Sequence, residues 1–303
     1  HAHNNGMSSN DDYFQKQDTP DWAKAWKFTH FSPSQANNPD DTWIANYFIA
    51  SRQERQTWAY NPNVIFGNAI HQGIGLVAKK TLSISEASTE TVKQLMTYMH
   101  KDEKERMQME RMKEVAPQYI SNAVNVLNAI KPLKKLQFIR EKSRSLELPR
   151  LELPIVMYTD LEYEDQGVEL KIKPPSFRGY RKDGKPSYAR GTLPNKPSIE
   201  HLRQVACYWY TAKKPFRIMY VNEKEARVFD SSNCEYMTNE NLELAMKYLQ
   251  RIFIRRQTLM KKYTELEDVA KVMNCDFSSF YWNGCPKRVL MESKKVFKVE
   301  SLK

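Results

Sequence analysis

Apolar residues in the first half of the chain recur at the three-to-four-residue spacing of amphipathic helices. Ser32 followed by Pro33 has the residue types of a helix start, because serine can cap a first turn and proline fits its first position. The pattern predicts helices over residues 33–55, 64–80, 85–115 and 118–130, and residues 131–143 are basic and compatible with another helix.

The pattern changes to extended segments after residue 146. Pro149 and Pro154 confine the first regular strand to residues 155–163, because proline cannot donate a hydrogen bond to a sheet. A turn at 164–167 leads to a second strand, which Pro174 ends. The elements predicted further along are a helix capped by Ser198 and ending near Ala212, strands at 216–221 and 227–229, and helices at 240–263 and 265–274.

This order of elements predicts one α/β domain with a central mixed sheet flanked by helices. We expect a helical N-terminal lobe at about 31–145, a core at about 146–230 and C-terminal helices at about 238–303. The first six residues, 1–6, are interpreted as the remnant of an expression tag, with Met7 as the native start.

Charge and composition narrow the class of partner. Lys and Arg number 47 against 36 Asp and Glu, a net charge of +11, which favours polyanionic partners: nucleic acid first, an anionic membrane surface second. Hydrophobic residues make up 41% of the chain, which excludes a disordered protein. No apolar run approaches the roughly 20 residues of a membrane span, and there is no signal-peptide pattern, so no membrane partner is expected.

Four cysteines are spread along the chain without a C-x-x-C pair: Cys207, Cys234, Cys275 and Cys285. Their spacing argues against a zinc ribbon and against a secreted disulfide scaffold. A reducing, cytoplasmic setting fits this pattern best.

The predicted hairpin collects charged side chains on one face. With a two- or four-residue turn centred between residues 165 and 166, Asp160 lies opposite Lys171 and Glu162 opposite Glu169, and paired residues share a face. A three-residue turn would break this register. The residues expected to face the core are Thr159, Leu161, Val168, Leu170 and Ile172. The alternative interpretation is a solvated sheet face held by salt bridges.

Carboxylates beside a lysine are also suited to metal chemistry. Mg²⁺ and Mn²⁺ prefer oxygen ligands, commonly one or two carboxylates together with water and substrate phosphate. Such a site can activate water and neutralise charge during phosphodiester cleavage. Asp160 and Glu169 are therefore candidate catalytic ligands, and Lys171 is a candidate for stabilising the transition state.

The order Asp160, then Glu169-Leu170-Lys171, resembles the Asp…Glu-x-Lys signature of the PD-(D/E)XK nuclease superfamily. The surrounding motifs, over about residues 31–230, resemble its RecB-like exonuclease branch in type and order. These motifs are Phe31-Ser32-Pro33-Ser34, then Gly67 and His71 as Gly-x-x-x-His, and Gln204 and Tyr208 as Gln-x-x-x-Tyr. The resemblance implies a restriction-endonuclease-like core.

The resemblance also implies roles for individual residues. His71, Asp160, Glu169 and the backbone carbonyl of Leu170 would hold Mg²⁺ or Mn²⁺. Gln204 and Tyr208 would support the site or contact DNA. Gly67 lies one helical turn before His71, and we expect it to let the helix approach the sheet.

Three features separate this chain from many relatives. Gln72 follows His71 where many relatives carry an acid, and Tyr158-Thr159 precedes Asp160 where glycine is common. Some members of the branch bind an iron–sulfur cluster through four cysteines. Here the cysteines lack the required spacing, so no iron–sulfur cluster is expected.

A proline- and glycine-rich connection, 174–197, is expected to be a long loop that holds nucleic acid. Its cations alternate with Phe177, Tyr180 and Tyr188, which suits single-strand binding, with Arg178 and Tyr180 as the preferred contacts. The alternative is a basic, disordered surface loop. The mixed charges of 101–113 and 131–144 predict solvated helix faces.

The function predicted from these observations is a metal-dependent DNA exonuclease that acts on single strands or duplex ends in recombination, repair or replication. The resemblance implies a stand-alone, phage-type enzyme in the bacterial host cytoplasm. An endonuclease with the same site, a catalytically inactive nucleic-acid-binding protein of the same fold and an RNA substrate remain the alternatives.

Overall fold

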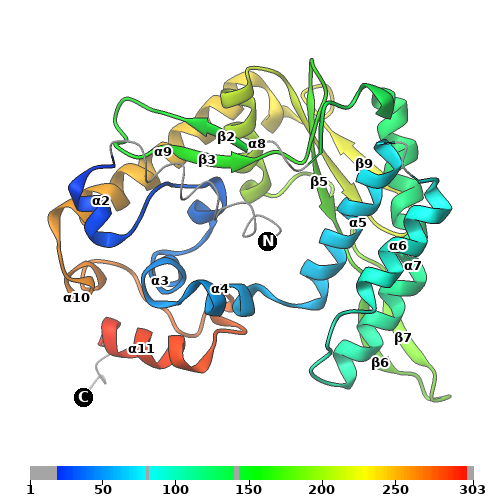
Figure 1. The fold of residues 1–303 in the computed structure, drawn as a ribbon, viewed down its shortest axis with the longest axis horizontal. Coiled ribbons are helices and arrows are strands. Elements are labelled where there is room, and N and C mark those ends of the chain that lie inside the picture. Colours follow the sequence, from blue (N-terminus) through cyan, green and yellow to red (C-terminus); the bar gives the residue numbers. More distant parts are fainter. Residues whose placement is uncertain (1–18, 80–81, 140–142, 299–303) are drawn as a thin grey trace. The chain divides into compact units, whose positions relative to one another are not determined.

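The structure is a computed structural model that describes residues 19–79, 82–139 and 143–298 (Figure 1). The predicted tag remnant, 1–6, and the predicted native start lie outside the described residues. The chain forms two compact units, each built from separate stretches of sequence. Unit 1 comprises His1–Tyr60, Ser143–Met157 and Glu243–Lys303, and unit 2 comprises Asn61–Lys142 and Tyr158–Leu242.

Unit 1 is mainly helical. Its short sheet pairs β2 (Ser143–Leu146) with β3 (Ile155–Tyr158), and Phe31 forms an isolated parallel bridge to Ile155. Its helices are α2 (Asp21–Trp26), η1 (Pro33–Asn37), α3 (Asp40–Ile44), the π-helical turn η2 (Ala45–Ile49), α4 (Arg52–Ala59), most of α9 (Asn239–Lys262), α10 (Leu266–Ala270), η5 (Phe280–Trp282) and α11 (Lys287–Phe297).

The single helix predicted over 33–55 is wrong, because the segment is divided into several helices. Asn38 is extended before Pro39, as expected from the steric conflict between a proline ring and a helical residue before it. Ser51 starts α4 with a capping box, in which its side chain accepts from the Glu54 amide and Glu54 accepts from the Ser51 amide.

Unit 2 contains the principal sheet, in the order β1-β4-β5-β8-β9. The pair β5–β8 is parallel and the other pairs are antiparallel, so the predicted mixed α/β class is confirmed. The strands are β1 (Phe138–Ile139), β4 (Leu161–Glu162), β5 (Gly167–Ile172), β8 (Phe216–Val221) and β9 (Ala226–Phe229). The helices are α5 (Pro62–Ala78), α6 (Ile84–Leu95), α7 (Glu103–Ile130), η3 (Leu133–Lys135), α8 (Ile199–Ala212) and η4 (Glu235–Met237).

Two helix boundaries in unit 2 differ from the prediction. The helix predicted over 85–115 is interrupted between α6 and α7, where Asp102 caps α7 by accepting from the Glu105 amide. The break predicted at Pro117 is absent from α7. An internal proline costs a helix about 3 kcal/mol, but the residues around it are packed in the core, and this burial outweighs the local preference.

The core of unit 2 lies between the sheet and the helices α5, α6 and α7, which lie side by side in Figure 1. Leu161, Val168 and Leu170 are buried in it, with Ile172 packed against its edge, so the predicted core face of the hairpin is confirmed for these four residues. Thr159, predicted on the same face, is buried but lies outside this cluster and donates to Glu162. Alternation along β5 turns Glu169 and Lys171 to the opposite face. No described helix has the length and apolar composition that crossing a bilayer requires.

The predicted register of the hairpin is wrong by two residues. Leu161 pairs with Val168 and Glu162 pairs with Gly167, and the Tyr163 amide donates to the Gln166 carbonyl at 2.7 Å. The turn is therefore centred one residue earlier than expected. If this pairing is continued by one residue beyond β4, Asp160 lies opposite Glu169 and not opposite Lys171. A shift of two residues preserves the faces, so the carboxylates still share a side.

The connection predicted as a loop over 174–197 is wrong in part, because it contains a β-hairpin. Strand β6 (Ser176–Tyr180) pairs with β7 (Pro186–Ala189), with an irregularity between Phe177 and Tyr180. The segment 131–143, compatible with a helix by sequence, forms η3 and β1 and runs partly outside the described residues.

Candidate functional site

Two carboxylates form the centre of the candidate site. Asp160 directly precedes β4, and its Oδ2 accepts a hydrogen bond from the Leu170 amide at 2.9 Å. Glu169 lies in the middle of β5. Their exposed fractions are only 4% and 3%, so the sheet holds two neighbouring acids away from water.

Burial raises the pKa of Glu169 well above its usual value of 4.5, and the adjacent Asp160 raises it further. The ammonium of Lys171, 3.3 Å from Glu169 Oε1, acts in the opposite direction. Oε2 of Glu169 is buried and has no hydrogen-bond partner among the described residues. An unsatisfied buried carboxylate oxygen is costly, and either a proton shared with Asp160, which accompanies the raised pKa of Glu169, or a bound cation would satisfy it.

His71 reaches the carboxylates from α5. Its Nδ1 lies 3.7 Å from Asp160 Oδ1, and its side chain is largely buried. The expected role of Gly67 in close packing is wrong: a Cβ at this position would meet nothing within 4 Å. The glycine that permits close packing on α5 is Gly73, where a Cβ would lie 2.5 Å from Thr91 Oγ1 and 2.7 Å from Ile120 Cδ1.

Gln204 and Tyr208 join the site from α8, one helical turn apart. Lys171 donates from Nζ to Gln204 Oε1 at 2.7 Å, which fixes the ammonium beside Glu169. Tyr208 is buried and hydrogen-bonded to Gln204. Burial, followed by the charges of Glu169 and Asp160, raises the pKa of Tyr208 well above its usual range, so its hydroxyl remains protonated.

Sequence reasoning assigned no role to His201 and overlooked Tyr220. His201 Nδ1 lies 2.6 Å from the Tyr220 hydroxyl, which also accepts from the Ser198 amide at 3.3 Å. Burial, with Lys171 and Lys173 nearby, lowers the pKa of His201 to about 3, so the imidazole is neutral at physiological pH. His201 lies three residues before Gln204 on the same face of the helix, and this spacing could have placed His201 near the site.

Glu162 does not belong to this group, although it was predicted on the same face. It is fully buried, pairs with Lys214 at 2.7 Å and accepts a hydrogen bond from Thr159. Because Asp160, Glu162 and Glu169 are all buried, the alternative of a solvated charged face is wrong.

The side chains predicted to hold a cation are His71, Asp160 and Glu169. Within the described part of the chain, no group of three or more His, Cys, Asp or Glu side chains has an arrangement that could hold a metal ion. The orphaned oxygen of Glu169, adjacent to a second carboxylate, nevertheless fits an oxygen-preferring cation such as Mg²⁺ or Mn²⁺. The Leu170 amide is held by Asp160, and the proposed use of its carbonyl stays a prediction.

The structure locates the two predicted nucleic-acid contacts on β6. Arg178 is exposed, and the Tyr180 hydroxyl donates to Glu103 Oε1 at 2.9 Å. The four cysteines are free thiols. Comparison of the sequence with protein-family models found no match, and comparison with curated proteins found none either.

Proposed function

We propose that this chain is a Mg²⁺- or Mn²⁺-dependent deoxyribonuclease of the RecB-like PD-(D/E)XK type. One observation carries the proposal: Glu169 is buried against Asp160, and one of its oxygens lacks a partner among the described residues. Two like charges placed together out of water are costly, and a cation between them offsets that cost.

In this proposal Asp160, Glu169 and His71 hold the cation. When bound, the cation would activate water and neutralise charge on the phosphodiester. Lys171 is held by Gln204 and Glu169, so its ammonium is preorganised to stabilise negative charge that develops on the phosphate. Protonated Tyr208 supports Gln204, and thereby the position of Lys171.

DNA is the proposed substrate, attacked from single-stranded or duplex ends in recombination, repair or replication. The support is the net charge of +11 and the basic segment that follows β5 directly. A stand-alone, phage-type exonuclease in the host cytoplasm is the proposed setting. An endonuclease would use the same residues and differ in how the strand reaches them.

The second candidate is a nucleic-acid-binding protein of this fold without catalytic activity. The absence of a closed three-side-chain metal group among the described residues favours this candidate. The retention of His71, Asp160, Glu169 and Lys171 in contact favours the nuclease.

A cleavage assay separates the candidates. End-labelled single-stranded, duplex and circular DNA are incubated with Mg²⁺, Mn²⁺ or EDTA, using wild type and Glu169→Ala. Glu162→Gln is the matched control, since it also removes a buried carboxylate from this hairpin but lies outside the site. Cleavage of linear DNA alone indicates an exonuclease, and binding without any cleavage supports the second candidate.

A further inference from the structure

The β6–β7 hairpin presents a dense group of cations. Between residues 176 and 190 the chain carries five Lys or Arg and a single acid, Asp183. Arg181 pairs with this acid at 3.5 Å. Arg178, Lys182 and Lys185 are exposed and have no carboxylate partner among the described residues. The hairpin is therefore a positive surface on which three of the five cations lack a described carboxylate partner, while Arg190 faces Glu223.

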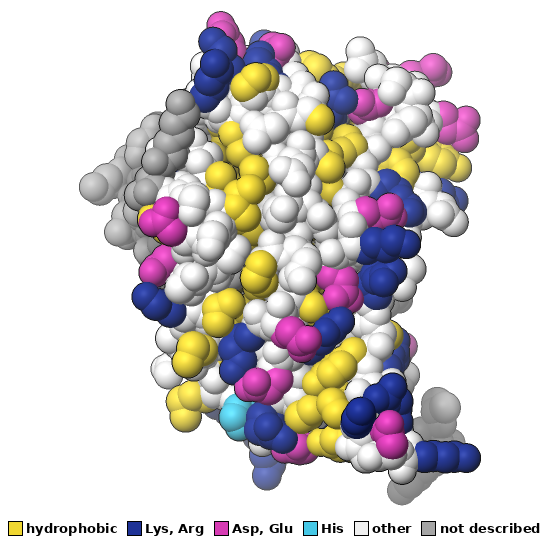
Figure 2. Space-filling model, turned by 90° about the vertical axis from the view of Figure 1, so that its right-hand side faces the viewer, with side chains coloured by type: hydrophobic (Ala, Val, Ile, Leu, Met, Phe, Trp, Pro, Cys, Tyr) yellow, Lys and Arg dark blue, Asp and Glu magenta, His cyan; other side chains and the backbone are white. Residues whose placement is uncertain are grey.

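Other charged surfaces of unit 2 differ in this respect. Figure 2 views the side on which α6, α7 and the β6–β7 hairpin all lie in Figure 1, and over this whole side Lys and Arg are interspersed with Asp and Glu. Along α7 the charges are paired one turn apart, as in Arg106 with Glu103 and Lys113 with Glu110. The prediction of a solvated, mixed-charge helix face is confirmed for 103–113, and such a face gives no strong attraction for a polyanion.

The aromatic side of the hairpin is fastened to α7. The ring of Phe177 lies 5.3 Å from that of Tyr180 and 5.7 Å from that of Tyr188. The side-chain oxygen of Gln108 accepts from the Phe177 amide at 2.6 Å, and its side-chain nitrogen donates to the Pro175 carbonyl. Tyr188 donates to the Met107 carbonyl at 3.2 Å. These contacts hold the hairpin in one position against the helix.

The base of the hairpin is fixed by close backbone packing. A Cβ at Gly191 would collide with the carbonyl of Lys173, so only glycine lets the returning chain pass the end of β5. The same carbonyl accepts from the Tyr119 hydroxyl at 2.5 Å, and Asn222 donates to the Gly191 carbonyl at 2.9 Å. The hairpin thus leaves β5, the strand of Glu169 and Lys171, at a fixed angle.

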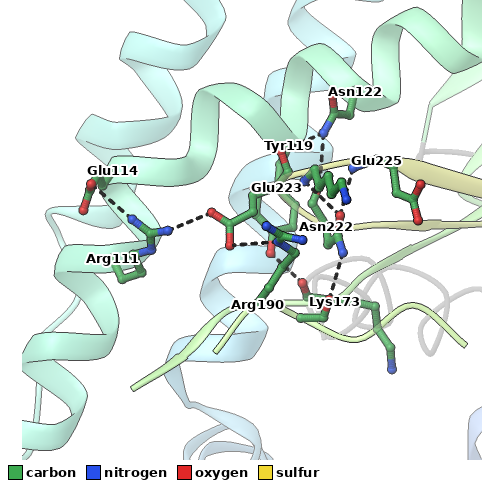
Figure 3. A network of polar contacts seen from close by, with 11 residues as sticks. Arg111, Glu114, Tyr119, Asn122, Lys173, Arg190, Asn222, Glu223 and Glu225 are labelled. Carbon is green, nitrogen blue, oxygen red and sulfur yellow. Dashed lines mark hydrogen bonds and ion pairs between the residues drawn. The ribbon is translucent and has the colours of Figure 1, made fainter. Parts of the chain in front are cut away.

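A polar network extends this anchor (Figure 3). Arg111 binds Glu223 at 2.9 Å and Glu114 at 3.1 Å, and its guanidinium lies over the ring of Tyr188. Glu223 also faces Arg190 of the hairpin at 3.9 Å. The turn after β8 is therefore joined to both α7 and the base of the hairpin.

We propose that the β6–β7 hairpin is a rigid arm that binds the sugar–phosphate backbone of a single DNA strand and that the Arg111–Glu223 network fixes its position. This inference rests on the proposed nuclease function and deepens it by naming the substrate form and the residues that hold it. The unpaired cations Arg178, Lys182 and Lys185 bind phosphates, and the exposed ring of Tyr180 beside them offers a surface for an unpaired base.

The fixed position of the hairpin favours binding of a strand. An arm that is already ordered loses little conformational entropy when it binds, which increases affinity without further contacts. A duplex keeps its bases stacked and unavailable to Tyr180, so a single strand is the better ligand. The arm follows β5, the strand that carries Glu169 and Lys171, after a connection of three residues.

The test measures binding of a fluorescent single-stranded oligodeoxynucleotide in EDTA, so that it is independent of cleavage. The arm variant combines Arg178→Ala, Lys182→Ala and Lys185→Ala. The matched control combines Lys93→Ala, Lys247→Ala and Lys271→Ala, which removes the same charge from exposed positions elsewhere. Anisotropy is recorded over a range of salt concentrations.

Each phosphate contact with a single strand contributes about 0.7 to the slope of log affinity against log salt, so losing three contacts should reduce the slope by about 2. From roughly 50 to 200 mM salt the affinity of wild type should then fall about 20-fold more than that of the arm variant. The control should keep the wild-type slope. An unchanged slope in the arm variant, or an equal loss in the control, overturns the proposal.

The anchor is tested by Glu223→Gln. This substitution removes a negative charge, so simple electrostatics predicts tighter binding, whereas loss of a rigid arm predicts weaker binding. Weaker binding with faster hydrogen exchange at 176–190 supports the proposal, and equal or tighter binding contradicts it. If wild type cleaves DNA but the arm variant binds the strand as tightly as wild type does, only the proposal of the arm is refuted. A wild type that neither binds nor cleaves DNA would refute both proposals.

Discussion

Burial and the neighbouring Asp160 raise the pKa of Glu169, so the ionised form of this acid is in an unfavourable environment. It is buried beside Asp160, and the partially exposed Lys171 lies 3.3 Å from its Oε1. The residue types and order of this site could be predicted from the sequence. The pairing of Glu162 with Lys214 could not, because it depends on the hairpin register and on a lysine more than 50 positions away.

The raised pKa of Glu169 predicts a pH-dependent stability. When the folded pKa of an acid lies above its unfolded value, its contribution to stability is complete below the unfolded pKa and is lost as pH rises through the folded pKa. In EDTA, Glu169→Gln should therefore unfold at a higher temperature than wild type at pH 8, and the difference should vanish below about pH 4.5. Thermal unfolding monitored by circular dichroism measures this.

The same experiment tests the cation. Mg²⁺ or Mn²⁺ should raise the unfolding temperature of wild type at pH 8, since a bound ligand stabilises the folded state, and should raise that of Glu169→Gln less. Equal stabilisation of both proteins would place any bound cation elsewhere.

Lys214 is expected to stabilise the folded state through its ion pair with Glu162. Lys214→Met removes the cation that lies 2.7 Å from the buried carboxylate of Glu162, and breaking such a pair costs about 3–5 kcal/mol of unfolding free energy. Urea unfolding gives the value. The double variant Lys214→Met, Glu162→Gln removes both charges and should recover much of the loss. Similar stabilities for the single and double variants would show that the ion pair is not the cause.

Helices and strands were predictable from the sequence where the hydrophobic pattern and the capping residues agree with the packing of the folded chain. Ser198 caps α8 as expected, and β8 has the predicted bounds, because its apolar residues are buried as a continuous run. The helix break expected at Pro117 is absent because burial of the neighbouring residues outweighs the cost of a proline inside a helix. The β6–β7 hairpin was missed because its fixed position depends on Gln108, a residue on a distant helix.

Two glycines of α5 give a prediction at this scale. Alanine is better than glycine in a helix by about 1 kcal/mol, and a Cβ at Gly67 meets open space, so Gly67→Ala should stabilise by up to about that amount. At Gly73 the Cβ would press against Thr91 and Ile120, and overpacking of this kind costs about 1–3 kcal/mol. Urea unfolding of the two variants should show opposite signs, and equal effects would contradict the packing of α5 described here.

The division of the molecule into units shows a limit of sequence reasoning. Periodicity reports which face of an element is apolar, but not which distant segment covers that face. Unit 2 joins the residues of the candidate site from α5, the β4–β5 hairpin and α8, while the sequence between them also contributes to unit 1. The prediction of one domain in three consecutive parts stays a prediction.

The net charge of +11 is a property of the whole chain, and its distribution is more informative than its size. On α7 opposite charges are paired, whereas on the β6–β7 hairpin three cations lack a carboxylate partner among the described residues. The proposed DNA-binding role depends on this local excess.

Degradation of end-labelled linear DNA by wild type, Glu169→Ala and Glu162→Gln, each with Mg²⁺, Mn²⁺ or EDTA, decides whether Glu169 belongs to a metal-dependent nuclease site. Wild type and folded Glu162→Gln are both expected to degrade the DNA in a metal-dependent manner. With Glu169→Ala the rate should fall at least about 100-fold, the scale expected when a group that stabilises the transition state is removed. Metal-dependent degradation that persists in Glu169→Ala at the wild-type rate would contradict the assignment of this site.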